Sequence, residues 1–210
     1  MSGSRRKIAV IGAGNVGATC AFVLAQKKLA DIVLLDIYEG FAKGKALDMS
    51  QNGQVLNYDG NLTGTSDYSD IAGAEVVVVT SGFPRQPGMT REDLIAKNAG
   101  IVKQVGEGIK QHAPESTIIM VTNPLDLMTY HMQKVTGFPA NRVCGQAGVL
   151  DSARMTHFVA DAIGCSEEDV HAMVLGGHGD TMVPLPRFTT VGGISITHLL
   201  DEETIDAICK

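Results

Sequence analysis

A glycine-rich turn between an apolar strand and a helix constrains the fold of this chain most. Residues 8–11 are continuously apolar, which is typical of a strand buried on both faces of a parallel sheet. A complete Gly-x-Gly-x-x-Gly follows, and apolar residues at helical spacing come after it. Gly12 permits a tight turn, Gly14 lets the backbone approach a pyrophosphate, and Gly17 lets the helix pack closely on the strand. The predicted dinucleotide-binding residues are Gly12, Ala13, Gly14, Asn15, Val16 and Gly17.

An acidic residue at the end of the next strand supports this prediction. Residues 32–35 form a second apolar run that ends in Asp36, 19 residues after Gly17. An acid about 20 residues beyond the glycine motif binds the adenine ribose hydroxyls in dinucleotide-binding folds. Asp36 would repel a 2′-phosphate, and residues 37–40 contain no basic side chain to neutralise one, so we expect NAD rather than NADP. The alternative is a glycine-rich turn in an unrelated α/β fold.

Strands alternate with helices along the first part of the chain. Two more β-branched apolar runs occupy residues 75–80 and 117–121. The expected helices are residues 39–51, 91–112 and 125–135. This alternation is the signature of βαβ units, so we expect an α/β fold with a doubly wound parallel sheet (Rossmann) in residues 1–146.

The pattern changes beyond about residue 145. A helix is expected at residues 149–162, and Asp201 is expected to cap a final helix. The short strands expected between them are residues 170–175, 183–190 and 194–197. We therefore expect residues 147–210 to be the start of a second, α+β substrate domain.

Composition excludes several other classes of function. The net charge of −6 gives no basic surface for nucleic acid or an anionic membrane. No apolar run approaches the roughly 20 residues of a membrane span, and only a strand-length run follows the basic N-terminus, so we expect no signal peptide. The four cysteines have neither metal-ligand nor C-x-x-C spacing, and the histidines have no metal-ligand spacing. We expect a cytoplasmic protein with reduced thiols and no metal site.

Charged residues suited to acid–base chemistry and carboxylate binding occur in the remaining segments. Arg85 and Arg91 belong to a loop rich in glycine and proline, Asp151 and Arg154 share one face of a helix, and His178 lies between glycines. A histidine held by a carboxylate moves a proton near neutral pH, and arginines grip carboxylates. Each residue alone also suits an ordinary structural or surface role. Beside a dinucleotide site, the set indicates hydride transfer on a small carboxylate-bearing alcohol or ketone.

Five motifs in this order resemble one known family. They are residues 12–17 with Asp36, residues 80–91, residues 121–124, residues 148–154 and residues 176–180. Residues 7 to about 200 resemble the lactate/malate dehydrogenase family, and most closely its lactate-dehydrogenase-like malate dehydrogenases.

The resemblance implies a role for each matching residue. His178 would be the acid/base, Asp151 would orient it, and Arg154 would clamp the carboxylate beside the reacting carbon. Arg91 would polarise the carbonyl, and Arg85 would bind a second carboxylate, hence malate and oxaloacetate. The remaining implied contacts are Asn123 with substrate and nicotinamide ribose, and Asn98 and the backbone around Val121 with the cofactor. The resemblance also implies a cis peptide bond between residues 123 and 124.

The resemblance also implies features of the whole enzyme. Chains of the family continue well past this point, so the 210 residues are expected to be a fragment, with an inactive natural truncation as the alternative. The complete protein is expected to form a homo-oligomer, a dimer or tetramer. The competing functional hypotheses are lactate dehydrogenase, which Arg85 argues against, and a non-catalytic dinucleotide-binding module.

Overall fold

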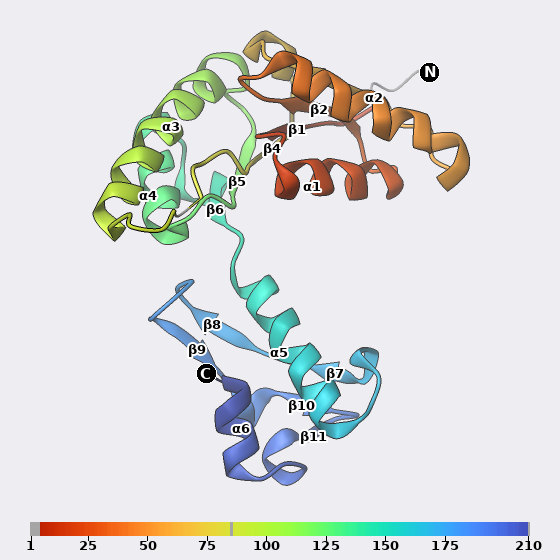
Figure 1. Cartoon of the computed structure of the whole chain (residues 1–210), viewed down its shortest axis with the longest axis vertical. Helices are drawn as coiled ribbons and strands as arrows, with labels where there is room; N and C mark the ends of the chain where they lie inside the picture. Colours follow the sequence, from red (N-terminus) through yellow and green to blue (C-terminus); the bar gives the residue numbers. More distant parts are fainter. Residues whose placement is uncertain (1–4, 85, 210) are drawn as a thin grey trace. The chain divides into compact units, whose positions relative to one another are not determined.

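A six-stranded parallel sheet organises the first part of the chain (Figure 1). Its strands are β1 (Lys7–Ile11), β2 (Asp31–Leu35), β3 (Leu62–Thr65), β4 (Val76–Val79), β5 (Thr117–Met120) and β6 (Val143–Gly145). The strand order is β3-β2-β1-β4-β5-β6, and every pairing is parallel. The order reverses direction between β1 and β4, which in doubly wound sheets opens a ligand crevice at the carboxyl ends of the strands. The predicted fold class is confirmed.

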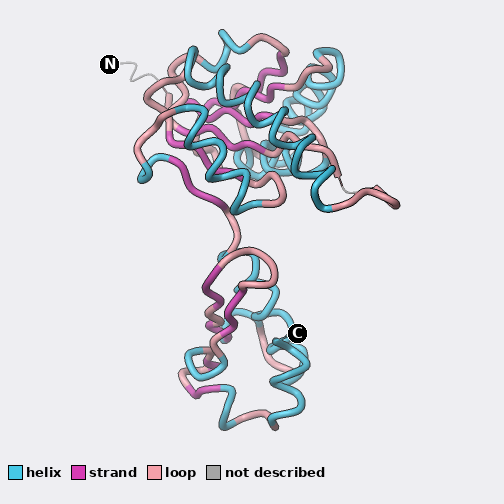
Figure 2. The backbone as a smooth tube through the Cα atoms, turned by 90° about the vertical axis from the view of Figure 1, so that its left-hand side faces the viewer, coloured by secondary structure: helices cyan, strands magenta, loops and turns pink. Residues whose placement is uncertain are grey.

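The computed structural model describes residues 5–84 and 86–209, which form two compact units that divide between residues 145 and 146. Helices flank the sheet of the first unit (Figure 2). They are α1 (Asn15–Gln26), α2 (Glu39–Leu56), α3 (Arg91–His112) and α4 (Leu125–Thr136), with short 3-10 turns η1 (Tyr68–Ile71) and η2 (Ala140–Arg142). Helix α2 is one turn longer than expected, since it ends only at a left-handed Asn57.

Small side chains let the first helices lie close to the sheet. Alanines of α1 and α2 form one buried cluster with apolar residues of β1 and β2. Val10 of β1 and Leu34 of β2 belong to this cluster, and both are 0% exposed. Alanine favours the helix because it has high helix propensity and no side-chain entropy to lose. Its small side chain also lets the helix lie close to the sheet. This packing fixes where β1 ends and α1 begins.

The second unit is built from short strands around one helix. Helix α5 (Gly148–Ile163) lies beside the hairpin β8 (Val174–Gly176) and β9 (Met182–Pro184). A second sheet has the order β11-β10-β7, and a final helix α6 spans Glu202–Cys209. Its strands are β7 (Val170–His171), β10 (Thr190–Val191) and β11 (Ile194–Ser195), and its 3-10 turns are η3 (Glu167–Asp169), η4 (Pro186–Phe188) and η5 (Ile196–His198).

Three strand predictions in the second unit are wrong in their extent, and the one at residues 194–197 ends at Ser195, where η5 follows. The expected strand 183–190 ends at Pro184 and becomes η4 at Pro186, because proline has no N–H to continue a ladder. The expected strand 170–175 is interrupted between β7 and β8. The predicted cap is confirmed, since the Thr204 N–H donates to Asp201 Oδ1 at 2.8 Å.

Within residues 5–84 and 86–209, no helix has both the length and the apolarity to cross a membrane.

Candidate functional site

The glycine loop follows β1 directly and has the shape that its sequence predicts. Gly12 has φ +103°, and a Cβ there would lie 2.8 Å from the Ser81 nitrogen. A Cβ at Gly17 would lie 1.8 Å from the Gly12 oxygen, so only glycine lets α1 start this close to β1. Gly14 differs, because a Cβ there would meet nothing within 4 Å. The outer side of the loop is therefore open, as a pyrophosphate would need.

The start of α1 provides backbone donors beside this open side. Gly14 is the N-cap and offers no side-chain acceptor, and the first turn carries no acidic residue. The first N–H groups of a helix have no intrahelical partner, and the helix dipole adds positive potential there. The donor set therefore fits an anionic phosphate group.

Asp36 lies at the end of β2, beside the glycine loop. Its Oδ2 accepts a hydrogen bond from the Ala13 N–H at 2.7 Å, and its Oδ1 accepts one from the Tyr38 N–H at 3.0 Å. The carboxylate is thus fixed where the sequence prediction needs it, at the strand next to the loop.

Asn98 and Asn123 are joined through a backbone contact. Asn98 lies on α3 and is only 1% exposed. Its Oδ1 accepts from the Phe83 N–H at 2.7 Å, while its Nδ2 donates to the Asn123 carbonyl at 2.6 Å and the Phe83 carbonyl at 3.3 Å. This amide holds two loops that follow β4 and β5, so any effect it has on a ligand acts through their shape. The bond between Asn123 and Pro124 is cis, as the resemblance implies.

Sequence reasoning missed three hydroxyl residues at the same edge. Thr80 Oγ1 lies 3.1 Å from the Gly12 carbonyl oxygen, and Thr122 Oγ1 donates to the Ser81 carbonyl at 2.7 Å. The Ser81 hydroxyl is buried and has no hydrogen-bond partner in the described structure. In sequence these residues look like ordinary strand ends. The one signal that could have found them is a hydroxyl residue directly after an apolar strand, in a chain that also has a glycine motif. A buried hydroxyl without a partner is costly, and its presence here fits a polar ligand.

Of the predicted site residues, the two arginines of the loop rich in glycine and proline are the least well described. Arg85 lies outside the described residues. Helix α3 begins at Arg91, of which only the backbone is described, after a capping box formed by Thr90 and Asp93. The roles expected for both side chains stay predictions.

Three predicted residues of the second unit come together. Asp151 on α5 is buried, and its Oδ2 lies 3.0 Å from His178 Nδ1. Arg154 Nη1 lies 3.5 Å from Asp151 Oδ1, and the Arg154 side chain is 60% exposed. We assign the Nδ1–H tautomer from this hydrogen bond, with the ring proton directed toward the carboxylate. The arrangement can orient an imidazole for proton transfer.

The backbone that carries His178 is tightly turned. Gly176 has φ +86°, and a Cβ there would lie 2.3 Å from the Thr181 oxygen. The Met182 N–H donates to the Gly179 oxygen at 2.9 Å, which closes the turn between β8 and β9. The hairpin therefore presents His178 to Asp151 from a short, constrained loop.

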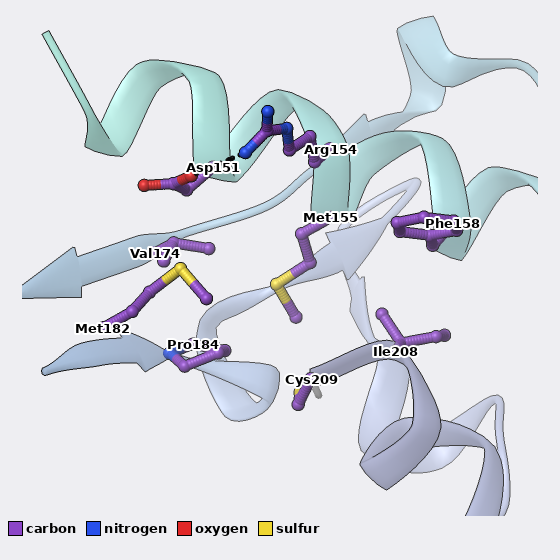
Figure 3. Close-up of a pocket in the computed structure, with 9 residues that line it drawn as sticks. All are labelled: Asp151, Arg154, Met155, Phe158, Val174, Met182, Pro184, Ile208 and Cys209. Carbon is purple, nitrogen blue, oxygen red and sulfur yellow. Dashed lines mark hydrogen bonds and ion pairs between the residues drawn. The ribbon is translucent and has the colours of Figure 1, made fainter. Parts of the chain in front are cut away.

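A pocket of about 180 Å³ lies beside Asp151 and Arg154 (Figure 3). Its other walls are mostly apolar, and they are formed by Met155, Phe158, Val174, Met182, Pro184, Ile208 and Cys209. Burial, with help from the Asp206 carboxylate, raises the pKa of the Cys209 thiol, so this wall is neutral and weakly nucleophilic. Among the residues that the structure describes, no cluster of three His, Cys, Asp or Glu side chains suits a metal ion.

Both units match known domains. Residues 6–145 match the lactate/malate dehydrogenase NAD binding domain, and residues 148–207 match the lactate/malate dehydrogenase alpha/beta C-terminal domain. The chain belongs to the lactate/malate dehydrogenase family. A protein named malate dehydrogenase 1 from Anaeromyxobacter dehalogenans is 56% identical over 98% of this chain and 67% of its own length. The malate dehydrogenase of Staphylococcus carnosus is 54% identical, over 99% of this chain and 67% of its own length.

Solved structures of the family are also similar. The apo malate dehydrogenase of Picrophilus torridus has a TM-score of 0.94 at 48% identity, covering 98% of this chain and 65% of that one. A Cryptosporidium parvum lactate dehydrogenase, solved with lactic acid and NAD, has a TM-score of 0.92 at 45% identity, covering 98% and 66%. This chain thus spans about two thirds of the length of these relatives. Because both activities occur at nearly equal TM-scores, the fold alone does not choose between lactate and malate.

Proposed function

We propose that this chain contains the cofactor-binding and proton-transfer groups of a malate dehydrogenase, which oxidises (S)-malate reversibly to oxaloacetate with NAD. The observation that carries the proposal is the buried Asp151 holding His178 at 3.0 Å beside Arg154. The similarity to proteins named malate dehydrogenase supports this substrate class. Under this proposal, residues 1–146 act as the NAD-binding domain and residues 147–210 belong to the substrate domain.

Proton transfer is assigned to the pair in the second unit. In malate oxidation the hydroxyl proton passes to His178 Nε2 as the adjacent carbon loses its hydride. The buried Asp151 carboxylate fixes the imidazole orientation and stabilises the imidazolium that forms. In the reverse direction His178 returns the proton to the carbonyl oxygen of oxaloacetate. When bound, NAD supplies the hydride acceptor.

Arginines and amides are assigned to substrate and cofactor. Arg154 binds the carboxylate beside the reacting carbon, Arg91 polarises the carbonyl, and Arg85 binds the second carboxylate. Asn123 contacts substrate and nicotinamide ribose. The cofactor contacts that we propose are residues 12–17, Asp36 and the Val121 backbone, while Asn98 acts on the cofactor through the two loops that it holds. We also place the protein in the cytoplasm as a homo-oligomer, a dimer or tetramer.

Absorbance of NADH with oxaloacetate or pyruvate tests the proposal. Oxidation of NADH that is much faster with oxaloacetate than with pyruvate supports malate dehydrogenase. Preference for pyruvate would indicate lactate dehydrogenase, the activity of a relative 45% identical to this chain. Binding of NADH without turnover of either substrate would indicate a non-catalytic dinucleotide-binding module. Sedimentation of the complete protein as a monomer would contradict the proposed oligomer.

A further inference from the structure

One peptide group of the glycine loop is held at both ends by side chains. The Gly12 carbonyl and the Ala13 N–H belong to the same peptide and point in opposite directions. Thr80 Oγ1, at the end of β4, lies 3.1 Å from the Gly12 oxygen and 3.2 Å from the Ile11 oxygen, so its hydroxyl is shared between two consecutive carbonyls. Asp36 Oδ2, at the end of β2, accepts from the Ala13 N–H at 2.7 Å. The two strands that flank β1 therefore grip this peptide from opposite sides.

Water has little access to either end of this peptide. Gly12 is buried and Ala13 is 0% exposed. Gly12 also has φ +103°, and glycine populates positive and negative φ about equally, so the local sequence alone does not fix the direction of the next peptide. A buried N–H that loses its acceptor costs free energy that water cannot return. Both side chains are therefore placed to set the orientation of the peptide before a ligand arrives.

The Asp36 carboxylate has acceptor positions to spare. It accepts one N–H on each oxygen, from Ala13 and from Tyr38. An ionised carboxylate offers about four lone-pair positions, so roughly two remain for ribose hydroxyls. Holding the loop and binding a ribose are compatible roles for one side chain.

We infer that Asp36 and Thr80 are positioning residues that fix the Gly12–Ala13 peptide, so that the N–H groups after it face the cofactor's pyrophosphate. The inference rests on the proposed NAD site and adds Thr80 to it. It gives Asp36 a second role that does not involve the ribose. Removal of either side chain should therefore weaken a diphosphate ligand that has no ribose hydroxyls.

The test uses ADP and 2′,3′-dideoxy-ADP, titrated calorimetrically into the full 210-residue chain. Asp36→Ala should weaken ADP strongly and should also weaken dideoxy-ADP by about tenfold, because a charged acceptor is lost from a buried N–H. Thr80→Val should weaken both ligands equally, by roughly three- to tenfold, because one neutral hydrogen bond is lost. Asp36→Asn and Thr80→Ser keep an acceptor and a donor, so both should restore most of the dideoxy-ADP affinity.

Thr63→Val is the matched control. The Thr63 hydroxyl also lies near a strand carbonyl of the same sheet, 3.4 Å from the Ile32 oxygen, but on β3. It should leave both affinities unchanged, and all variants are compared at a temperature where melting curves show them folded. Unchanged dideoxy-ADP binding by Asp36→Ala would limit Asp36 to the ribose and overturn its positioning role. A Thr80→Val effect no larger than that of Thr63→Val would overturn the role of Thr80.

Failure of the proposed function gives a different result. A wild-type chain that binds neither ADP nor NADH overturns the NAD site and this inference together. A wild-type chain that binds both, with variants that do not change dideoxy-ADP binding, overturns the inference alone.

Discussion

The two units build their candidate sites from different parts of the polypeptide. In the first unit the donors are backbone N–H groups, shaped by glycines at the end of a five-residue strand. In the second unit the chemistry lies in the side chains of Asp151, His178 and Arg154, on a helix and on a hairpin whose strands have three residues each. The first site should therefore respond to changes of shape, and the second to changes of chemical identity.

Loss of the imidazole should produce the largest effect and leave the first unit intact. His178→Gln should lower turnover by about two to four orders of magnitude in both directions, as for loss of a general acid or base. NADH affinity should stay unchanged, since the backbone site is untouched.

The pH dependence sharpens this test. Oxaloacetate reduction consumes a proton from His178 and should slow as pH rises, whereas malate oxidation needs neutral imidazole and should accelerate. Residual activity of His178→Gln should lose this opposition. If both directions keep their profiles, His178 is not the acid/base.

A variant of Arg85 tests whether a side chain of the first unit also determines which substrate is recognised. Oxaloacetate has a second carboxylate, and removing the partner of a buried charge costs about 3–5 kcal/mol. Arg85→Gln should therefore lower kcat/KM for oxaloacetate by roughly two to four orders of magnitude, while pyruvate falls little or rises. Steady-state kinetics with both substrates measure this. An equal loss on both would assign Arg85 to loop closure instead of recognition.

Two glycine variants test shape in the first unit. Gly17→Ala places a methyl group 1.8 Å from the Gly12 oxygen, so α1 must move, and overpacking of this kind costs about 1–3 kcal/mol or more. Gly14→Ala meets nothing within 4 Å, so it should cost only about 1 kcal/mol or less, the preference for glycine over alanine at an N-cap. Urea melts and NADH titrations of both variants should show stability loss in the first and a selective affinity loss in the second. Equal melts would contradict the packing argument.

The smallest expected effect is a difference in alkaline stability. All four tyrosines lie before residue 146, and burial raises the pKa of Tyr68 to about 12. Its contribution to stability is complete below pH 10 and is lost as pH rises from 10 through 12, because only the unfolded phenol ionises readily in that window. Tyr68→Phe should reduce this loss by at most about 1–2 kcal/mol after solvent screening. Urea melts at pH 9 and pH 11 measure it, and an unchanged pH dependence would rule Tyr68 out as the cause.

Sequence predicted the fold of the first unit better than that of the second for a physical reason. Buried parallel strands such as Ile8–Ile11 are continuous apolar runs, and the glycine motif fixes the turn that follows. The second unit uses strands of two or three residues, which are too short for a periodic pattern. The expected strand 183–190 failed there because prolines at 184 and 186 outweigh its β-branched residues.

The candidate site shows the same limit. The charges of Asp151 and His178 stand out in sequence, and the structure places them in contact. Thr80 did not stand out, because its role depends on the Gly12 carbonyl, 68 residues away along the chain. Hydrogen bonds from side chains to distant backbone atoms leave no local pattern in the sequence.

The amide of Asn98 has a consequence for hydrogen exchange. Phe83 is 44% exposed, but its backbone N–H donates to Asn98 Oδ1, and Asn98 is only 1% exposed. The Phe83 amide proton should therefore exchange with solvent deuterium only when Asn98 releases it, in spite of the exposure of the residue. Residues 81–83 should therefore move with the sheet on fast timescales.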